Sequence, residues 1–159
     1  MEVLHNKILS IKELVFLVNQ WRLRGDQIVF TNGCFDFLHE GHIKVLSESR
    51  KQGDRLIVGL NDDSSVQRLK GQKRPIKDQV QRALCLSAMF LVDAVCLFSE
   101  DTPINLIEKI RPEVLVKGGD YQIEEVVGAN LVQSNGGQVH IVPLVPERSS
   151  TSYIEKMKS

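Results

Sequence analysis

The sequence predicts a doubly wound α/β fold built on a five-stranded parallel sheet. Five short apolar runs recur along the chain, at residues 28–30, 56–60, 94–98, 114–116 and 139–142. Each run is continuous rather than alternating, as in strands that are covered on both faces. The segments between the runs are long enough for crossover helices, and this alternation of strand and helix is typical of a parallel sheet.

The first expected element is a helix over residues 11–24. Ser10 and Glu13 have the spacing of a capping box, apolar residues then recur at helical intervals, and Gly25 ends the pattern. The length of the chain suits a single domain that spans residues 1–159. Because this helix precedes the first strand, we expect residues 1–25 to form a helical extension of that domain.

Crossover helices are expected between the strands. The segments are residues 43–51, a longer stretch over 62–90, then 103–110 and 123–134, with a final helix over 149–158. Thr102 supplies a capping residue and Pro103 the first helical position, while a run of asparagine and two glycines closes the 123–134 helix. The apolar side chains within 62–90 suit the core and the interface of a homodimer equally well.

The composition excludes several classes of protein. Of 159 residues, 42% are hydrophobic and 25% charged, and 20 lysines and arginines balance 20 aspartates and glutamates. No overall basic field is available to gather nucleic acid or anionic lipid, so neither is an expected partner. Three cysteines without a close pair indicate a reducing compartment, and no leader or long apolar run is evident. We therefore expect a cytoplasmic protein that does not span a membrane.

The most informative stretch is residues 31–42, which read TNGCFDFLHEGH. It links the first predicted strand to a helix, at the carboxyl end where open α/β sheets bind ligands. His39 and His42 share one face near the positive end of that helix, and Gly41 between them lets backbone approach a ligand. We expect the ligand to be phosphate. Two alternatives stay open: the histidines serve only as helix caps, or they join Cys34 in a zinc site.

A basic run over residues 68–77, RLKGQKRPIK, is the second candidate segment. It holds five cations and no acid, and its glycine and proline mark a loop. Such a run is commonly a solvated surface, but Arg82 on the following helix points to a shared phosphate pocket. Lys70, Arg74 and Arg82 are therefore our candidate phosphate ligands.

Two further segments follow the fourth and fifth predicted strands. Residues 117–121 read KGGDY, in which paired glycines permit close approach of backbone to a ligand, with Lys117 and Asp120 at the rim. An ordinary turn has the same composition. Residues 146–152 read PERSSTS, and place hydroxyls at a predicted helix start just after Arg148, where they either cap the helix or bind a second phosphate.

Together these segments resemble the cytidylyltransferase-like nucleotidyltransferase family, whose members share an HxGH motif after the first strand and a hydroxyl-rich motif after the last. The likeness is nearest to the adenylyltransferases of the ADP-heptose pathway. The passages that carry it are residues 30–36, 68–76, 116–121 and 143–149. The chain departs from the family ending EGRSTTR, because Glu147, Ser150 and Ser152 stand in place of glycine, threonine and arginine.

The resemblance implies a Rossmann-like nucleotidyltransferase fold and an enzyme that joins ATP and D-glycero-β-D-manno-heptose 1-phosphate to give ADP-heptose and pyrophosphate, for the lipopolysaccharide core. A phosphate monoester, with a second pKa near ~6, is largely dianionic at neutral pH and needs no general base. Mg²⁺ is expected through the ATP phosphates. The alternatives are a transferase of the same fold that uses CTP, GTP or another phosphorylated alcohol, and a non-catalytic nucleotide-binding module.

The resemblance also implies roles for the candidate residues. The catalytic set, at the triphosphate and the transition state, is His39, His42, Lys70 and Arg148. The nucleotide-binding set is Thr31, Asn32, Gly33, Phe35, Gly41, Lys117, Gly118, Gly119, Asp120, Ser149 and Thr151. The substrate-binding set is Asp36, Arg74 and Arg82, with Asp36 at the sugar hydroxyls or a hydrated magnesium ion. No side chain is assigned as a direct metal ligand.

Overall fold

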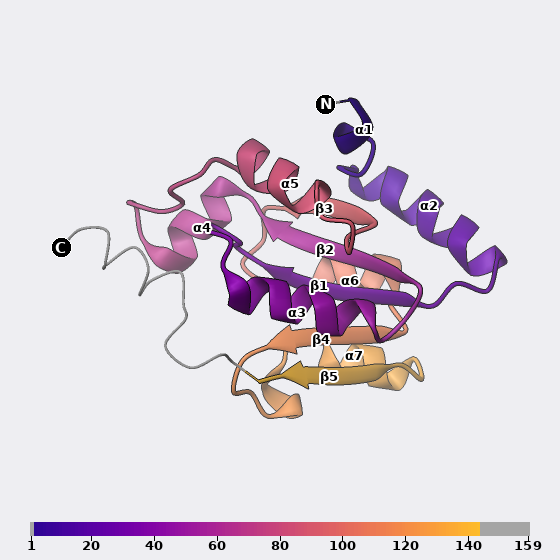
Figure 1. Ribbon diagram of the computed structural model, residues 1–159. Helices are drawn as coiled ribbons and strands as arrows, with labels where there is room; N and C mark the ends of the chain where they lie inside the picture. Colours follow the sequence, from indigo (N-terminus) through magenta and orange to yellow (C-terminus); the bar gives the residue numbers. More distant parts are fainter. Residues whose placement is uncertain (1, 144–159) are drawn as a thin grey trace.

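The computed structural model describes residues 2–143, which form one parallel sheet with helices on both faces (Figure 1). The strands lie in the order β3-β2-β1-β4-β5. Their bounds are β1 Ile28–Gly33, β2 Arg55–Asn61, β3 Ala94–Phe98, β4 Val114–Gly118 and β5 Gln138–Val142. The predicted doubly wound five-stranded sheet is therefore confirmed, and each strand covers the apolar run that predicted it.

The strand order places β1 at the centre of the sheet and creates a topological switch point beside it. From β1 the chain builds outward through β2 and β3, then returns to add β4 and β5 on the other side. The β1–β2 ladder joins six residue pairs, from Ile28 and Arg55 to Gly33 and Leu60. The β1–β4 ladder joins only two pairs and ends at Phe30 and Leu115. The carboxyl ends of β1 and β4 are consequently unpaired with each other, which leaves space between them.

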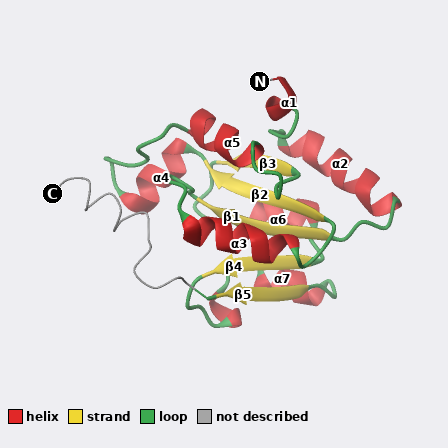
Figure 2. Ribbon diagram, viewed as in Figure 1, coloured by secondary structure: helices red, strands yellow, loops and turns green. Residues whose placement is uncertain are grey.

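Seven α-helices and one 3₁₀ helix connect the strands in the described residues (Figure 2). Their bounds are α1 Glu2–His5, α2 Ile11–Leu23, α3 Glu40–Arg50, α4 Asp63–Lys70, α5 Gln79–Ser87, α6 Ile104–Ile110, η1 Ile123–Glu125 and α7 Ala129–Ser134. The capping box predicted for α2 is present, because the Ser10 hydroxyl accepts from Glu13 N and Glu13 accepts from Ser10 N.

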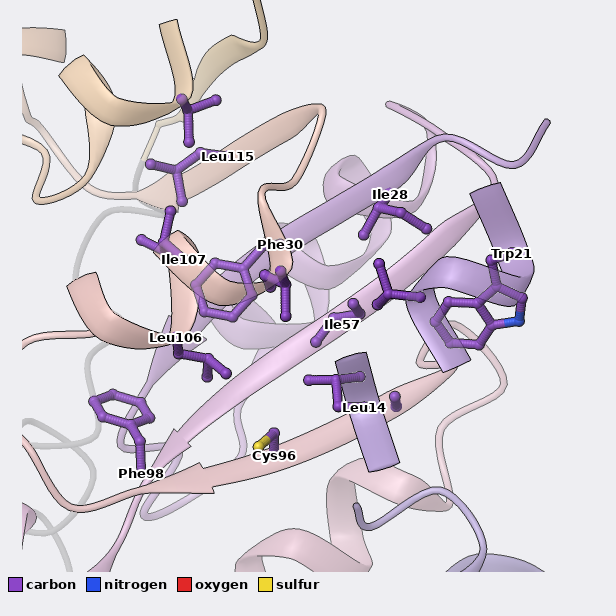
Figure 3. Packing of buried hydrophobic residues seen from close by; sticks show 14 of the residues in the cluster. Leu14, Trp21, Ile28, Phe30, Ile57, Cys96, Phe98, Leu106, Ile107 and Leu115 are labelled. Atoms are coloured by element: carbon purple, nitrogen blue, oxygen red, sulfur yellow. The ribbon is translucent and has the colours of Figure 1, made fainter. Parts of the chain in front are cut away.

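Two apolar layers hold the helices to the sheet. On one face, α2, α6 and α7 pack on β1, β2, β3 and β4, through a cluster that includes Leu14, Phe30, Ile57 and Ile107 (Figure 3). On the other face, α3 and α5 pack on the same sheet through a second cluster that includes Leu46 and Leu86. Figure 1 shows α3 in front of the sheet and α6 and α7 behind it. Complete burial of such side chains is the main stabilising term of the fold.

Three helix predictions differ from the structure in detail. The 62–90 stretch forms two helices, because Gly71, with φ +96°, ends α4 and Asp78 caps the start of α5. The 123–134 stretch forms η1 and α7, separated at Gly128, which also has positive φ. Pro103 is the N-cap of α6 rather than its first residue. The helix predicted over 149–158 lies outside the described residues.

The apolar side chains of the 62–90 stretch divide between the core and the surface. Ala83 and Leu86 are buried in the core, whereas Leu69, Val80 and Phe90 are exposed. Homodimer formation stays a prediction. Between residues 2 and 143, every helix is too short or too polar to cross a bilayer.

Candidate active site

A cavity of about 490 Å³ opens where β1 and β4 separate. Its volume is within the range of small-molecule sites, and a crevice at the switch point is where this class of sheet binds ligands. Eight of the predicted site residues line it: Thr31, Asn32, Gly33, Phe35, His42, Lys70, Lys117 and Gly118. The parallel topology thus brings together segments that are up to 87 residues apart in sequence, from Thr31 to Gly118.

The turn after β1 forms the first wall of the cavity. Phe35 has a left-handed φ of +45° and a buried ring, so the chain reverses sharply at this point. An added Cβ at Gly33 would lie 3.1 Å from the Phe35 ring, which makes the glycine the residue that permits this packing. A strained turn held by its surroundings is a common feature of functional sites.

The two predicted histidines stand together at the start of α3. The ring centroids of His39 and His42 are 3.9 Å apart, and that of Phe35 lies 5.0 Å from His42. His39 is the N-cap of α3, where its Nδ1 accepts from Gly41 N at 3.1 Å. His39 and Gly41 thus shape the helix start, and His42 lines the cavity; phosphate binding by either histidine stays a prediction.

Burial keeps both histidines in the neutral form. It lowers the pKa of His42 from 6.5 to about 4, with smaller contributions from His39 and Lys70. It lowers the pKa of His39 as well. A neutral imidazole still offers one N–H donor to a phosphate oxygen, and an approaching anion would favour its protonated form.

The end of β4 forms the opposite wall. Burial lowers the pKa of the Lys117 ammonium, whose Nζ lies 3.4 Å from Asn32 Oδ1 across the crevice. In the described residues no carboxylate pairs with Lys117, so a half-buried cation faces the cavity without a counter-charge. Only glycine fits at position 118 without a shift of its surroundings, because an added Cβ would lie 2.4 Å from Val45 Cγ2 on α3. An anionic ligand is the natural partner for this wall.

A third wall comes from the end of α4. Lys70 in its last turn lines the cavity together with Leu69. The segment that follows, residues 71–77, connects α4 to α5, and we call it the basic loop. His42 on α3, Lys70 on α4 and Lys117 on β4 thus approach one space from three different elements.

The remaining predicted substrate ligands, Asp36, Arg74 and Arg82, do not line the cavity. Asp36 and Arg82 have fully buried side chains, and each is bonded to protein groups around the basic loop. Those partnerships were not predicted from the sequence. Direct contact of the three residues with a substrate stays a prediction, and in this conformation the Arg82 guanidinium has no exposed surface for a phosphate.

Several other predicted residues lie at the margin of the site or beyond the structure. Gly119, with φ +147°, donates its N–H to Val142 O at 3.0 Å, and so turns the chain away from β4. Asp120 next to it is exposed. The predicted phosphate ligands Arg148, Ser149 and Thr151 lie outside the described residues.

The cavity also has walls that sequence reasoning missed. The residues are Cys34, Val45, Asn61, Leu69, Asp101, Thr102, Pro103, Tyr121, Glu125, Val126 and Val127. Asn61 ends β2, and Thr102 follows β3, so the rule that directed attention to the ends of β1 and β4 would have found them too. Cys34 and Tyr121 lie within the candidate segments 31–42 and 117–121, although neither was assigned to the site. The other residues have no polar motif that marks them in the sequence.

The zinc alternative does not fit the described residues. Among residues 2–143, no group of three or more histidine, cysteine, aspartate or glutamate side chains is arranged to hold a metal ion. Cys34, His39 and His42 are therefore near one another in sequence without forming a ligand set. The arrangement suits recognition of an anion by donors and cations.

A family model described as cytidylyltransferase-like matches residues 30–156. Among similar proteins are two called bifunctional protein HldE. The one from Pseudomonas paraeruginosa is 50% identical over 151 residues, which are 95% of this chain and 32% of that protein. The one from Trichlorobacter lovleyi is 51% identical over 152 residues, which are 96% of this chain and 31% of that protein. The chain therefore spans about a third of the length of these relatives.

Two solved structures resemble the fold. The lipopolysaccharide core biosynthesis protein from Thermoplasma volcanium has a TM-score of 0.62 and 32% identity, over 76% of this chain and 98% of that one. The pantoate-beta-alanine ligase from Francisella tularensis, complexed with beta-gamma ATP and beta-alanine, has a TM-score of 0.65 over 94% of this chain and 72% of that one. Its identity of 15% shows a shared fold alone.

Proposed function

This chain belongs to the cytidylyltransferase-like family and is a nucleotidyltransferase; from that premise we propose that it joins ATP and D-glycero-β-D-manno-heptose 1-phosphate. The products would be ADP-heptose and pyrophosphate, used for the lipopolysaccharide core. The sequence identity of 50% and 51% with two bifunctional HldE proteins supports heptose 1-phosphate as the sugar substrate. The similar Thermoplasma volcanium protein, whose name refers to lipopolysaccharide core biosynthesis, supports the pathway.

The observation that carries the proposal is the convergence of His42, Lys70 and Lys117 on one cavity at the switch point. His42 follows β1, Lys70 follows β2 and Lys117 lies near the end of β4, and each supplies a donor or a cation. A triphosphate and a sugar phosphate together bring several negative charges to one place. Lys117 is half-buried and pairs with no carboxylate among residues 2–143, and the imidazole of His42 is largely desolvated. Such a site has the chemistry that the reaction requires.

The proposed step is a displacement at the α-phosphorus of ATP. A phosphate oxygen of the sugar 1-phosphate forms a new bond to the α-phosphorus, and the bond from that phosphorus to the α,β-bridging oxygen breaks. The electron pair leaves with pyrophosphate, and no proton has to be removed from the nucleophile, because its second pKa is near ~6. Catalysis then consists of alignment and relief of negative charge.

We assign the charge relief to the cavity walls. His42 would donate to the phosphate at which charge develops, and Lys117 would hold a phosphate from the β4 side, with Lys70 opposite. Thr31, Asn32, Gly33 and Phe35 would line the nucleotide. His39 would support His42 through contact of their tilted rings, whose centroids are 3.9 Å apart. Arg148, Ser149 and Thr151 stay proposed triphosphate ligands.

Magnesium is proposed as an ion that arrives with ATP. It keeps several waters and is often bound mainly through phosphates. Residues 2–143 offer no ready-made cage of three or more acidic, histidine or cysteine side chains, which suits an ion held by the triphosphate. Bound there, it would offset the charge of the phosphate oxygens.

The deciding experiment is a matrix of substrates. Pyrophosphate release is measured with ATP, CTP and GTP, each paired with heptose 1-phosphate, glucose 1-phosphate and glycerol 3-phosphate. We expect release with ATP and heptose 1-phosphate to exceed every other pairing by at least about tenfold. His42→Ala protein, purified identically, controls for a contaminating transferase.

Other outcomes have distinct meanings. Greater release with CTP, GTP or another phosphorylated alcohol would replace the proposed substrates and keep the reaction type. ATP binding without release in any pairing would contradict the proposed transfer and leave a nucleotide-binding module.

A further inference from the structure

The basic loop, residues 71–77, is bonded to two buried charged side chains, Asp36 and Arg82, which lie outside the cavity. We propose that Asp36 and Arg82 are positioning residues, which fix this loop against the turn after β1 and thereby hold Lys70 and Arg74 where phosphate binds. The inference rests on the proposed function, because the role of the loop is to serve the phosphate groups of the substrates. It gives Asp36 a task that differs from contact with sugar hydroxyls or magnesium.

The carboxylate of Asp36 accepts three hydrogen bonds from the basic loop. Its Oδ2 accepts from Arg74 Nε at 2.5 Å, and its Oδ1 accepts from the backbone N–H groups of Ile76 at 2.7 Å and Lys77 at 3.2 Å. The carboxylate is completely buried. Both oxygens are thus engaged with the loop, across 38 to 41 residues of sequence.

Arg82 completes the attachment from the first turn of α5. Its guanidinium donates to Lys77 O at 3.1 Å, at the far end of the loop. It also donates to Cys34 O at 2.6 Å, in the turn after β1, and to Asn61 O at 2.8 Å, at the end of β2. A fourth bond runs to Asp63 Oδ1 at 2.8 Å, at the start of α4. One buried side chain therefore joins the loop to two strand ends that border the cavity.

The burial of these charges favours positioning over substrate contact. A buried charge is stable only when its partners are in place. The partners of Asp36 lie in the loop, and those of Arg82 lie in the loop, after β1, at the end of β2 and at the start of α4. Arg82 has no exposed side-chain surface. Breaking such a network leaves an uncompensated buried charge, so the loop has a strong preference for this one arrangement.

This arrangement leaves one buried hydrogen-bond donor of Arg74 open to a ligand. Its Nε is bonded to Asp36, which fixes the plane of the guanidinium. Its Nη2 is buried and has no hydrogen-bond partner among the described residues. A buried donor of this kind calls for an acceptor, and a phosphate oxygen is one that the proposed substrates supply.

Limited proteolysis tests the attachment without using activity. Trypsin cleaves after lysine, so Lys70, Lys73 and Lys77 report opening of the basic loop, whereas Arg74 is protected by the following proline. We expect Asp36→Asn to raise the cleavage rate in the loop by about tenfold or more. The reason is that the carboxylate, which accepts hydrogen bonds from three donors of the loop, loses its charge. The matched control is Asp78→Asn, which makes the same chemical change next to the loop, leaves Asp36 intact and keeps an acceptor for the Gln81 N–H at the start of α5. Its cleavage is scored at Lys70 and Lys73, because the change directly follows Lys77.

Kinetics separates positioning from a merely structural effect. Asp36→Asn is expected to raise the KM for the phosphorylated substrates about tenfold, with kcat reduced by less than that factor. If Asp36→Asn does not fold, Arg74→Gln removes the contact of Nε with Asp36 and carries the proteolysis measurement, with Lys73 and Lys77 still open to trypsin.

Three results would overturn the proposal. One is an unchanged cleavage rate in Asp36→Asn, another is faster cleavage with unchanged KM, and the third is a loss confined to kcat with altered magnesium dependence. The proteolysis result stands even if the wild-type protein transfers no nucleotide. In that case the proposed function fails, while the attachment of the loop is still decided.

Discussion

Replacing His42 by asparagine should lower turnover and, at the same time, make the fold less sensitive to acid. Both effects come from the position of the imidazole, which is buried against His39 and Phe35 at the edge of the cavity. Burial lowers its pKa from 6.5 to about 4. The native state therefore keeps this ring neutral over a pH range in which the unfolded chain binds a proton.

The sign and size of the acid effect follow from that difference. As pH falls through 6.5, the unfolded chain takes up a proton and gains stability relative to the folded one, until His42 itself titrates near pH 4. A pKa difference of this size corresponds to about 3 kcal/mol. Wild-type protein should thus lose about 3 kcal/mol more than His42→Asn between about pH 7 and about pH 4.

Urea unfolding of both proteins at a series of pH values measures the acid effect directly. Parallel curves of unfolding free energy against pH would show that the ring is not held neutral by burial. In the same preparations, kcat of His42→Asn should fall by ~10²-fold or more, as expected for loss of a transition-state donor. Near-normal turnover would remove His42 from the mechanism. His140→Asn, on β5 and away from the cavity, controls for the effect of removing a histidine on turnover.

Three other predictions concern the cavity walls. Activity that needs the charged form of Lys117 should decline as pH rises through its lowered pKa, below the usual 10.5; a pH profile should show this basic limb move upward in Lys117→Arg, and an unmoved limb would assign it to another group. Gly118→Ala should lower stability by about 1–3 kcal/mol, because its Cβ would lie 2.4 Å from Val45 Cγ2; thermal unfolding should show recovery in the double variant with Val45→Ala, and no recovery would mean that the strain lies elsewhere. A thiol reagent should modify Cys34 in the cavity well before buried Cys96, whose pKa is raised to about 11; peptide mass spectrometry should find ATP protecting Cys34, and equal labelling with and without ATP would place the nucleotide elsewhere.

Much of the fold could be predicted because its strands are buried on both faces. Continuous apolar runs such as 94–98 carry that burial in the sequence itself, and β3 has the same bounds. The position of the site followed from topology, since the carboxyl ends of parallel strands meet at one edge. This is why Asn32 and Lys117 were expected together, and their side chains do face each other at 3.4 Å.

Residues whose roles depend on distant partners could not be predicted in the same way. Asp36 and Arg82 have the residue types of ligands, and only the folded arrangement shows that they bond to the basic loop, to Cys34 and to Asn61. Nothing local in the sequence separates a charge that binds a phosphate from one that supports a loop. The division of residues 62–90 was predicted, since the glycine and proline of the basic run mark a loop before the helix that carries Arg82. Its exact start was not, because α4 continues to Lys70 and ends at Gly71, which has positive φ.

The central claim is that a sugar phosphate attacks the α-phosphorus of ATP in the cavity between β1 and β4. Heptose 1-phosphate labelled with oxygen-18 in its non-bridging phosphate oxygens tests it, with ³¹P NMR of the products as the measurement. The account predicts the label in the new phosphorus–oxygen–phosphorus bridge of ADP-heptose and none in pyrophosphate. Label in the released phosphate or pyrophosphate, or ADP formed without ADP-heptose, would contradict it.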